Sequence, residues 1–381
     1  MKILVISHEY PPIGGGGANA CYFLSREYVR QGHEVTIVTA KYKDLPEEEI
    51  QNGVHIIRVK AKRTKEDKST FAEMFSYLKS AYFYADKLCK KEKFDICQVY
   101  FGIPGGPIGV HLWRKYKLPY IVRFGGGDIP GAQKRFGFMY KILSPFIRDI
   151  WKNAKALVAN SEILRERALA YESRYPVSII ANGVDSEFFT PGKEEKEKEK
   201  TEKTEKTANL QILFVSRLIK GKGLQYIIPQ MPRVNKETGA VLTIVGDGPY
   251  REELEKITDE SNARDAVIFV GKKNKEELYP YYDSADMFIL PSESEGMPNV
   301  VLEAMSMGLP VVMTPCGGSK ELIDGNGIIS KQEDFVENML MLLKNRERMH
   351  TYGYESARRA RELFAWEQKA KEYLELMEKV L

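Results

Sequence analysis

Long apolar runs are missing from this chain of 381 residues. No stretch approaches the roughly 18 consecutive apolar residues that a membrane-spanning helix needs. The start, MKILVISHEY, has only a short apolar run at residues 3–7, too short for the core of a signal peptide. We therefore expect a first buried strand there, in a cytoplasmic protein without a membrane span.

Cysteine is scarce, and the chain has no Asp-x-Asp pair that could hold a divalent metal. The four cysteines show none of the spacings of a metal site: Cys21, Cys89, Cys97 and Cys316. We expect plain buried thiols in a reducing compartment. The sequence thus predicts no metal and no bound cofactor.

Signatures of two other protein classes are missing as well. Glycines 14–17 follow the first predicted strand, but they do not form G-x-G-x-x-G, and no acidic residue ends the second predicted strand at residues 35–39. Both features are expected of a dinucleotide-dependent oxidoreductase, which we keep as the third alternative. No nucleic-acid-binding motif is present, so no nucleic acid is expected as a partner.

The charge that is present is unevenly distributed. Residues 1–190 carry a net charge of +9 and residues 191–381 one of −5, within a formal net charge of +4. A basic first half is typical of a protein with an acidic partner or an anionic membrane surface. Scattered, solvated lysines explain it equally well.

The most informative stretch is PSESEGMPNVVLEAMSMGLPVV, at residues 291–312. An apolar run ends at Pro291, a polar turn follows, and residues 299–307 are apolar with a helical period. A glycine and a proline then end the helix before another apolar run. This pattern predicts a strand–loop–helix–strand unit of an α/β fold.

The loop of this unit offers an arrangement that suits an anion. Backbone amides at a helix N-terminus are unpaired and carry the positive end of the helix dipole, and here they belong to Gly296, Met297, Asn299 and Val300. Pro298 suits the first helical turn because its missing N–H costs nothing there. Glu295 in the loop and Glu303 two turns into the helix point to the same side. We expect two carboxylates and a row of amides around one ligand.

The two glutamates, in EGMPNVVLEAM followed by GLPVV, resemble the E-x7-E motif of retaining glycosyltransferases of the GT-B type, specifically family 4. The resemblance implies that Glu295 approaches the donor sugar and that Glu303 binds the ribose hydroxyls of the nucleotide. From the residues alone, the alternative is an ordinary βαβ crossover with solvated acids.

Two cations follow another predicted strand, at residues 212–215. Arg217 and then Lys222 precede the next helix, and two fixed cations can bind a diphosphate whose charge grows as it leaves. The segment resembles the S/G-R-L…K-G motif of the family, which implies phosphate-binding positions for both; surface cations on a loop are the alternative. Gly271, at the end of the strand at 267–270, is implied to meet the base through its backbone.

The first half resembles the family more loosely. The glycines before GHEV imply that Gly15, Gly16 and Gly17 face the donor diphosphate or the acceptor. In the family, the strand at 120–124 is usually followed by a His or another polar residue that contacts the donor sugar near C6. Here that position is Gly125, which leaves the contact unfilled.

Two nearby residues are candidates for the contact that Gly125 does not make. They are Arg123 and Asp128, and the sequence does not favour one over the other. For Asp128, a cap of a helix or a turn is an equally good interpretation.

Two segments of the first half combine aromatic side chains with helical spacing or basic residues. Residues 71–88 predict a helix whose aromatics pack in the core or, as the second interpretation, form an apolar face for a lipid-linked acceptor. Residues 133–151 interleave Lys and Arg with aromatics, which favours an acceptor or membrane face over a core helix. An anionic membrane surface is thus a candidate partner, with peripheral association on its inner face.

The resemblance covers nearly the whole chain and implies two Rossmann-like domains that face a central cleft, with a C-terminal helix that crosses back to the first. ANGVDSEFFTPG resembles the family's hinge between the domains. We expect an N-terminal acceptor domain at 1–190 with the helix 366–381, and a donor domain at 209–365. Between them lies the segment 191–208, in which residues 193–207 are only Lys, Glu and Thr. This composition predicts a solvated insert or linker.

The expected function is the metal-independent, retaining transfer of a hexose from a UDP-, GDP- or ADP-sugar to a saccharide, lipid-linked or small-molecule acceptor. The residues expected to act in catalysis are Glu295, Arg217, Lys222 and Asp128. One alternative is a nucleotide-sugar epimerase on the same fold. Another is a catalytically silent protein that binds nucleotide sugars or lipids.

Overall fold

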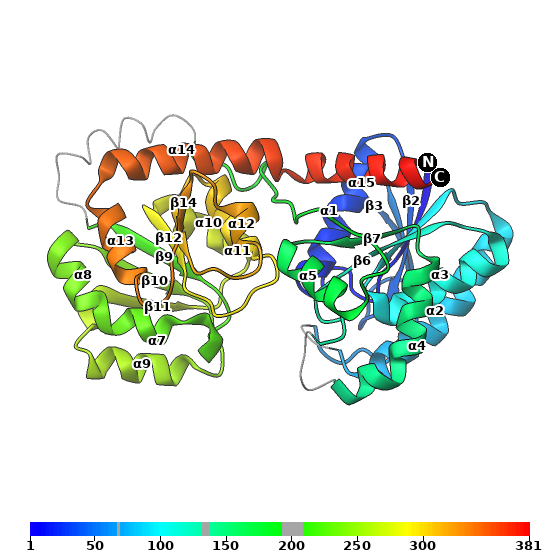
Figure 1. The fold of residues 1–381 in the computed structure, drawn as a ribbon, viewed down its shortest axis with the longest axis horizontal. Helices are drawn as coiled ribbons and strands as arrows, with labels where there is room; N and C mark the ends of the chain where they lie inside the picture. Colours follow the sequence, from blue (N-terminus) through cyan, green and yellow to red (C-terminus); the bar gives the residue numbers. More distant parts are fainter. Residues whose placement is uncertain (67–68, 132–136, 193–208) are drawn as a thin grey trace. The chain divides into compact units, whose positions relative to one another are not determined.

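A computed structural model describes residues 1–66, 69–131, 137–192 and 209–381. The chain forms two compact units (Figure 1). Unit 1 comprises Met1–Asn182 and Trp366–Leu381, and unit 2 comprises Gly183–Ala365. Most of the predicted insert or linker, at 193–208, lies outside the described residues.

Unit 1 is built on an eight-stranded sheet in the order β3-β4-β2-β1-β5-β6-β7-β8. The strands are β1 (Lys2–Ile6), β2 (Glu34–Ala40), β3 (Glu48–Gln51), β4 (Val54–Val59), β5 (Ile96–Tyr100), β6 (Tyr120–Arg123), β7 (Ala156–Ala159) and β8 (Val177–Ile179). All neighbours are parallel except β3 and β4. The central strands β1, β5 and β6 are buried along almost their whole length because helices cover both faces of the sheet.

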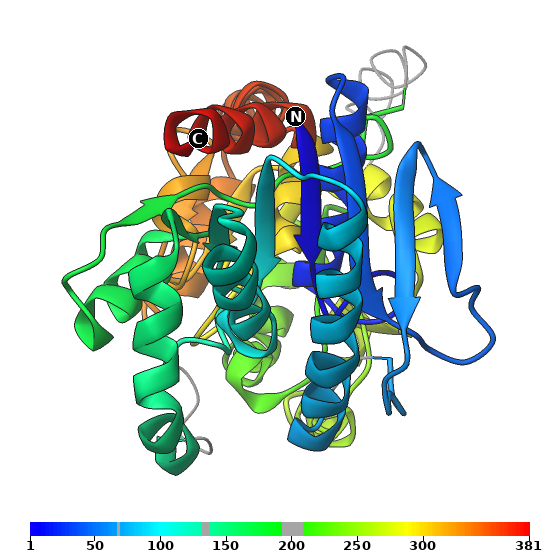
Figure 2. The ribbon, with the colours of Figure 1, turned by 90° about the vertical axis from the view of Figure 1, so that its right-hand side faces the viewer.

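Helices pack on both faces of this sheet: α1 (Gly16–Arg30), α2 (Phe71–Lys91), α3 (Gly102–Tyr116), α4 (Gly137–Asn153), α5 (Glu162–Tyr171) and α15 (Trp366–Val380). Figure 2 shows α2, α3 and α4 side by side on one face. On the other face α15 lies against α1, and the ring of Trp366 stacks on that of Phe23 at 5.5 Å. The prediction that the C-terminal helix returns to the first domain is confirmed.

Unit 2 has a parallel six-stranded sheet in the order β11-β10-β9-β12-β13-β14. Its strands are β9 (Gln211–Val215), β10 (Val241–Val245), β11 (Val267–Gly271), β12 (Met287–Leu290), β13 (Val311–Met313) and β14 (Gly327–Ile329). Its helices are α7 (Leu224–Ile227), α8 (Met231–Thr238), α9 (Arg251–Glu260), α10 (Lys275–Ser284), α11 (Asn299–Ser306), α12 (Ser319–Leu322), α13 (Phe335–Leu343) and α14 (Arg346–Leu363). The predicted strand–loop–helix–strand unit is confirmed as β12–α11–β13.

The order of the strands indicates where each sheet can bind a ligand. In unit 2, β9, β10 and β11 follow one another to one side, and β12, β13 and β14 follow one another to the other. The loops after β9 and β12 therefore begin side by side, where the order reverses. In unit 1 the corresponding neighbours are β1 and β5. Open parallel sheets bind ligands outside the carboxyl ends of their strands at such points.

Two expectations from composition concern the cysteines and the membrane. Cys21, Cys97 and Cys316 are buried thiols, Cys89 is half-buried, and all four are free. Burial raises the pKa of the Cys21 thiol to about 12. Within the described part of the chain, no helix is both long and apolar enough to cross a membrane.

Candidate functional site

The loops after β9 and β12 are joined by an ion pair. The Lys222 ammonium, in a short 3-10 turn (Lys220–Lys222), donates to Oε1 of Glu295 at 2.6 Å. The two side chains are only 17% and 14% exposed. Two residues that the sequence assigned to one ligand therefore lie together at the carboxyl edge of the sheet.

The backbones of these two loops are also in direct contact. The amide of Glu293 donates to the carbonyl of Gly221 at 2.9 Å. Gly223 has a φ of +78°, and a Cβ added to it would lie 1.9 Å from the carbonyl oxygen of Pro291. This position requires glycine both for its left-handed backbone and for the close approach of the neighbouring loop. The Lys222–Glu295 pair thus has a rigid base.

Arg217 lies on the same loop as Lys222, directly after β9. Its side chain is exposed and has no polar partner among the described residues. The next residue, Leu218, exchanges backbone hydrogen bonds with the loop after β10: its amide donates to Asp247 and its carbonyl accepts from Tyr250. The loop is therefore fixed while the guanidinium faces solvent, as an anion-binding group requires.

The helix that follows the loop after β12 begins at Asn299, as predicted, but Pro298 stands before it. Pro298 is the N-cap of α11, with φ −77° and ψ 107°, and the helix begins at Asn299. The expectation that Pro298 stands in the first helical turn was therefore wrong. The amide of Val301 donates to the carbonyl of Pro298, so the amides of Gly296, Met297, Asn299 and Val300 precede the helical hydrogen-bond ladder.

A loop to which the sequence gave no role supports this segment. A Cβ on Gly317 would lie 2.2 Å from the carbonyl oxygen of Glu295, and one on Gly318, which has a φ of +84°, would lie 2.8 Å from the sulfur of Met297. The segment CGGSKELI after β13 therefore packs against the loop that carries Glu295. A pair of glycines was the only sequence signal for this role.

Glu303, on α11, has a different partner from Glu295. Its Oε2 accepts a hydrogen bond at 2.8 Å from the hydroxyl of Tyr282, a buried residue of α10. Burial raises the pKa of the Glu303 carboxyl, although the bond from Tyr282 and the nearby ammonium of Lys275 both act against that rise. The buried phenol thus fixes the orientation of this carboxylate.

Gly271 ends β11 with a φ of +84°, and its carbonyl accepts from the amide of Gly246 at 2.8 Å. Gly246 in turn allows no side chain, because a Cβ there would lie 1.8 Å from the carbonyl oxygen of Ser216. The loops after β9, β10 and β11 are thus in backbone contact, and Gly271 lies on the same edge of the sheet as Arg217.

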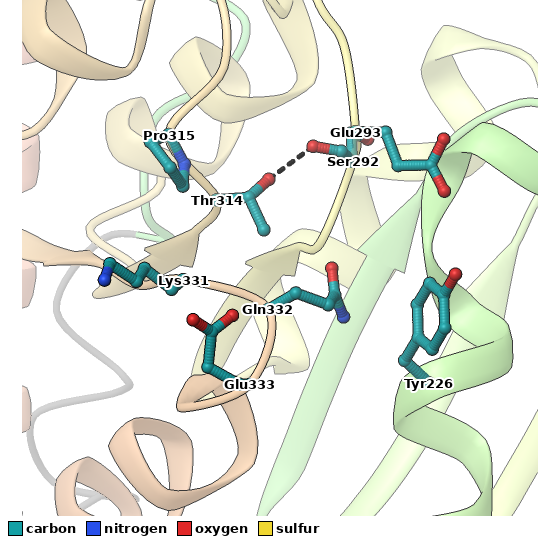
Figure 3. A pocket seen from close by; sticks show the side chains of 8 residues that line it. All are labelled: Tyr226, Ser292, Glu293, Thr314, Pro315, Lys331, Gln332 and Glu333. Carbon is teal, nitrogen blue, oxygen red and sulfur yellow. Dashed lines mark hydrogen bonds between the residues drawn. The ribbon is translucent and has the colours of Figure 1, made fainter.

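Beside the loop after β12 there is a hollow of ≈ 480 Å³ (Figure 3). Its lining consists of Tyr226, Ser292, Glu293, Thr314, Pro315, Lys331, Gln332 and Glu333. The hydroxyl of Thr314 donates to the carbonyl of Ser292, which ties the loop after β13 to the loop after β12. None of these residues was predicted from the sequence as part of the site.

In unit 1, the glycines after β1 lie closer to the helix than expected. Gly15 is the N-cap of α1, and Gly16 and Gly17 form its first turn rather than a preceding loop. The Gly15 amide donates to the buried carboxylate of Glu9, and a Cβ on Gly15 would have nothing within 4 Å. A Cβ on Gly17 would lie 2.5 Å from the ring of Phe101.

Asp128 is buried and binds backbone amides. Its two carboxylate oxygens accept from the amide of Gly102 at 2.7 Å and from that of Gly125 at 2.9 Å. Burial raises the pKa of this carboxyl, and the amide hydrogen bonds oppose the rise. The geometry is that of a cap, which joins the start of α3 to the turn after β6.

Arg123, the other candidate for the missing sugar contact, points into the interior of unit 1. It is 2% exposed and donates to Oδ1 of Asn182 at 2.5 Å. Its guanidinium also lies over the ring of Tyr100. The structure therefore gives Arg123 a place in the core and not at the edge of the sheet.

The two aromatic segments of unit 1 each have a buried and an exposed side. On α2, Tyr77, Ala81 and Ala85 are buried, whereas Phe75 and Phe83 are 68% and 65% exposed. On α4, Ile147, Ile150 and Trp151 are buried, whereas Ile142 and Phe146 are 59% and 63% exposed. Residues 132–136 lie outside the described part of the chain. The buried sides confirm that part of each helix packs in the core, and an acceptor or membrane face on the exposed sides stays a prediction.

Metal-binding side chains do not gather anywhere in the described residues: no group of three or more His, Cys, Asp or Glu could hold an ion. The charged groups at the carboxyl edge of unit 2 include Arg217, Lys222 and Glu295. Together with the amides before α11, they can bind an anion next to a carboxylate.

Comparison with known proteins identifies the family to which this chain belongs. The family model described as "Glycosyltransferase Family 4" matches residues 14–188, and "Glycosyl transferases group 1" matches residues 209–345. An uncharacterized glycosyltransferase of Methanocaldococcus jannaschii is 31% identical over 345 residues, 86% of this chain and 84% of that protein. The alpha-monoglucosyldiacylglycerol synthase of Streptococcus pneumoniae is 27% identical over 82% of this chain and 70% of its own.

Among solved structures, HepE of Anabaena in complex with UDP and glucose has the same fold, with a TM-score of 0.73 at 18% identity over 100% of both chains. The first family model covers most of unit 1, and the second lies within unit 2. From the matched models, the relative in Methanocaldococcus jannaschii and the shared fold, we conclude that this chain is a glycosyltransferase of family 4, with the GT-B fold.

Proposed function

We propose that this glycosyltransferase transfers a hexose from a nucleoside-diphosphate sugar, with retention of the anomeric configuration and without a metal. The observation that carries the proposal is the Lys222–Glu295 pair, which lies with Arg217 where the strand order of unit 2 reverses. A diphosphate needs cations and amides, and a sugar hydroxyl needs a carboxylate; this edge offers both. HepE, which shares the fold, was solved with UDP and glucose.

The chemistry that these groups can support follows from their charges. In the transfer, the bond from the anomeric carbon to the diphosphate oxygen breaks, and a bond to an acceptor hydroxyl oxygen forms. Arg217 and Lys222 stabilise the negative charge that grows on the departing diphosphate. That diphosphate then takes the proton from the acceptor hydroxyl, on the same face of the sugar. Glu295 orients the donor sugar.

Glu303 has a separate role in this proposal. Its carboxylate, held by the Tyr282 hydroxyl, accepts hydrogen bonds from the ribose hydroxyls of the nucleotide. Gly271 and its neighbours offer backbone groups to the base. Because Arg217 and Lys222 supply two cations for the diphosphate, the proposal requires no divalent ion for leaving-group departure.

For the acceptor, we propose a lipid-linked or saccharide hydroxyl presented at an anionic membrane surface. Phe75, Lys79, Phe83 and Lys87 recur every four residues along α2, so they form one exposed stripe of aromatic and basic side chains. Aromatic rings can enter the headgroup region while lysines bind anionic lipids. The similar synthase of Streptococcus pneumoniae is named for a diacylglycerol product.

The proposal is tested by following the anomeric proton of UDP-, GDP- and ADP-hexoses by NMR, with EDTA present and with mixed lipid or saccharide acceptors. We expect one nucleotide to support transfer and the product to keep the anomeric configuration of the donor. Conversion of the sugar without any acceptor would instead indicate an epimerase. Binding without turnover, with every acceptor offered, would indicate a catalytically silent protein.

A further inference from the structure

Phe101 stands directly after β5, where the strand order of the unit 1 sheet reverses. Its backbone has φ 66° and ψ 128°, a left-handed φ that bulky residues rarely adopt. The amide of Phe101 donates to the carbonyl of Arg123, and the next amide, that of Gly102, donates to Asp128. Hydrogen bonds on both sides thus hold the residue in this conformation. Such backbone outliers are concentrated at functional sites.

Two glycines leave the space that the ring of Phe101 occupies. A Cβ on Gly125, after β6, would lie 2.2 Å from the ring, and a Cβ on Gly17, in α1, would lie 2.5 Å from it. No side chain fits at either position while the ring stands there. The ring of Phe101 fills the volume that a polar side chain at position 125 would take, so this position can hold only glycine.

The imidazole that contacts the ring is uncharged, and the carboxylate of Asp128 is bound by backbone amides. The imidazole of His8 meets the Phe101 ring edge-on at 4.7 Å, and burial lowers the pKa of His8 to about 3, so the imidazole is uncharged near pH 7. Asp128 is engaged by the amides of Gly102 and Gly125. Phe101 is itself only half-buried, so part of it faces solvent at the edge of the sheet.

We propose that Phe101 is a specificity-determining residue, whose ring selects a neutral sugar that turns a C–H-rich face toward it, in place of a polar contact from position 125. The inference rests on the proposed hexose transfer. The C–H bonds of a sugar face suit the negative face of an aromatic ring. A carboxylate on the sugar would lose water against the ring. The cation near His8, Arg63, is only 2% exposed and is already paired with Glu9 at 3.6 Å. The selected sugar is either that of the donor or that of the acceptor.

The test compares the full-length protein with Phe101→Leu and Phe101→Ala, using the nucleotide that the wild type accepts. In the donor arm, hydrolysis without acceptor is measured for the hexose and the hexuronate donor. In the acceptor arm, KM is measured for a neutral and a uronate acceptor. We expect Phe101→Ala to lower the preference for the neutral sugar by about tenfold or more in one arm, which identifies the source. Phe101→Leu, which keeps an apolar side chain, should change it less.

Two further variants separate selectivity from folding. Gly125→Ala should destabilise the protein through its collision with the ring, and Phe101→Ala combined with Gly125→Ala should recover the midpoint of thermal unfolding. Tyr354→Ala, an exposed aromatic of α14, is the matched control and should change neither arm. If folded Phe101→Ala and Phe101→Leu keep the wild-type preference in both arms, the role of Phe101 is overturned. A wild type without any turnover would instead overturn the proposed transfer, and the inference with it.

Discussion

The ammonium of Lys222 lies 2.6 Å from the carboxylate of Glu295, although 73 positions separate the two residues along the chain. Each neutralises the other while no donor is bound, and both side chains are largely shielded from water. A diphosphate that binds Lys222 would take over much of the charge that now faces Glu295. The carboxylate is then available for a sugar hydroxyl, at a place that the loop backbone already fixes.

Glu295→Gln should lower kcat strongly. The amide keeps the size of the side chain but loses the negative charge, and with it the ion pair with Lys222. Losing one preorganised electrostatic contact costs on the order of 10²–10³ in kcat. Steady-state kinetics at saturating donor measure the effect. Glu253→Gln, an exposed residue of α9, should leave kcat near the wild-type value. Equal losses in both variants would contradict the assignment.

Arg217→Ala should reduce turnover by a similar factor, about 3–4 kcal/mol in activation free energy. Arg217→Lys should recover only part of it, because an ammonium keeps the charge but loses the planar fork that binds two phosphate oxygens. Arg346→Ala, at the start of α14 and also exposed, serves as the control. Near-normal turnover in Arg217→Ala would remove this residue from the diphosphate site.

Donor binding should depend on pH through Glu303. Its pKa is raised, so as pH falls the carboxylate takes up a proton, and loses its ability to accept from ribose, at a higher pH than an ordinary glutamate. Tyr282→Phe removes a hydrogen bond that lowers this pKa, so the loss of affinity should begin at a still higher pH. Calorimetric titration with the nucleoside diphosphate between pH 4.5 and 8 measures the shift. Identical pH profiles in Tyr282→Phe, wild type and a Tyr281→Phe control would refute it.

Asp128→Ala should destabilise unit 1, because two amides lose their buried acceptor. Each such loss costs about 1–3 kcal/mol in the free energy of unfolding. Asp128→Asn keeps one acceptor oxygen and should cost less. Denaturant unfolding measures stability, and kcat of Asp128→Asn well below the unfolding transition tests catalysis separately. A stable but inactive Asp128→Asn would support the catalytic role over the cap.

Membrane binding should depend on the exposed stripe of α2. Phe75→Ser with Phe83→Ser should weaken binding to vesicles of any charge, whereas Lys79→Glu with Lys87→Glu should abolish the preference for anionic lipid. Each lysine near such a surface contributes about 1 kcal/mol. Co-sedimentation with phosphatidylcholine vesicles, with and without phosphatidylglycerol, distinguishes these effects. Ile268→Ser and Lys256→Glu, both exposed in unit 2, are the controls, and equal binding by all variants would exclude the stripe.

Local patterns predicted much of the fold and part of the site. The apolar runs at residues 3–7 and 212–215 became buried strands, and the helix that carries Glu303 was placed to within a residue at each end. These elements are determined by burial and by turn residues that act within a few positions. The short edge strand β3 was not foreseen, because its sequence EEIQ is mostly exposed and has little apolar character.

Contacts between distant loops could not be read from the sequence. Nothing local indicates that Lys222 pairs with Glu295, since the contact depends on β9 and β12 being neighbours in the sheet. The glycine at position 125 likewise shows only that the polar side chain usual in the family is missing there, and not what fills its place. That the ring of Phe101 fills the space follows from the left-handed backbone at residue 101, which no sequence pattern predicts.

The most direct test of the central claim is a thermal-shift titration of the full-length protein with UDP, GDP and ADP in the presence of EDTA. A ligand that binds the folded state raises the unfolding midpoint with its concentration. The account predicts that one nucleoside diphosphate raises the midpoint despite EDTA, that Lys222→Ala reduces the shift, and that Lys220→Ala, exposed on the same turn, keeps it. A shift that EDTA abolishes, or that survives unchanged in Lys222→Ala, would contradict the cation-bound diphosphate.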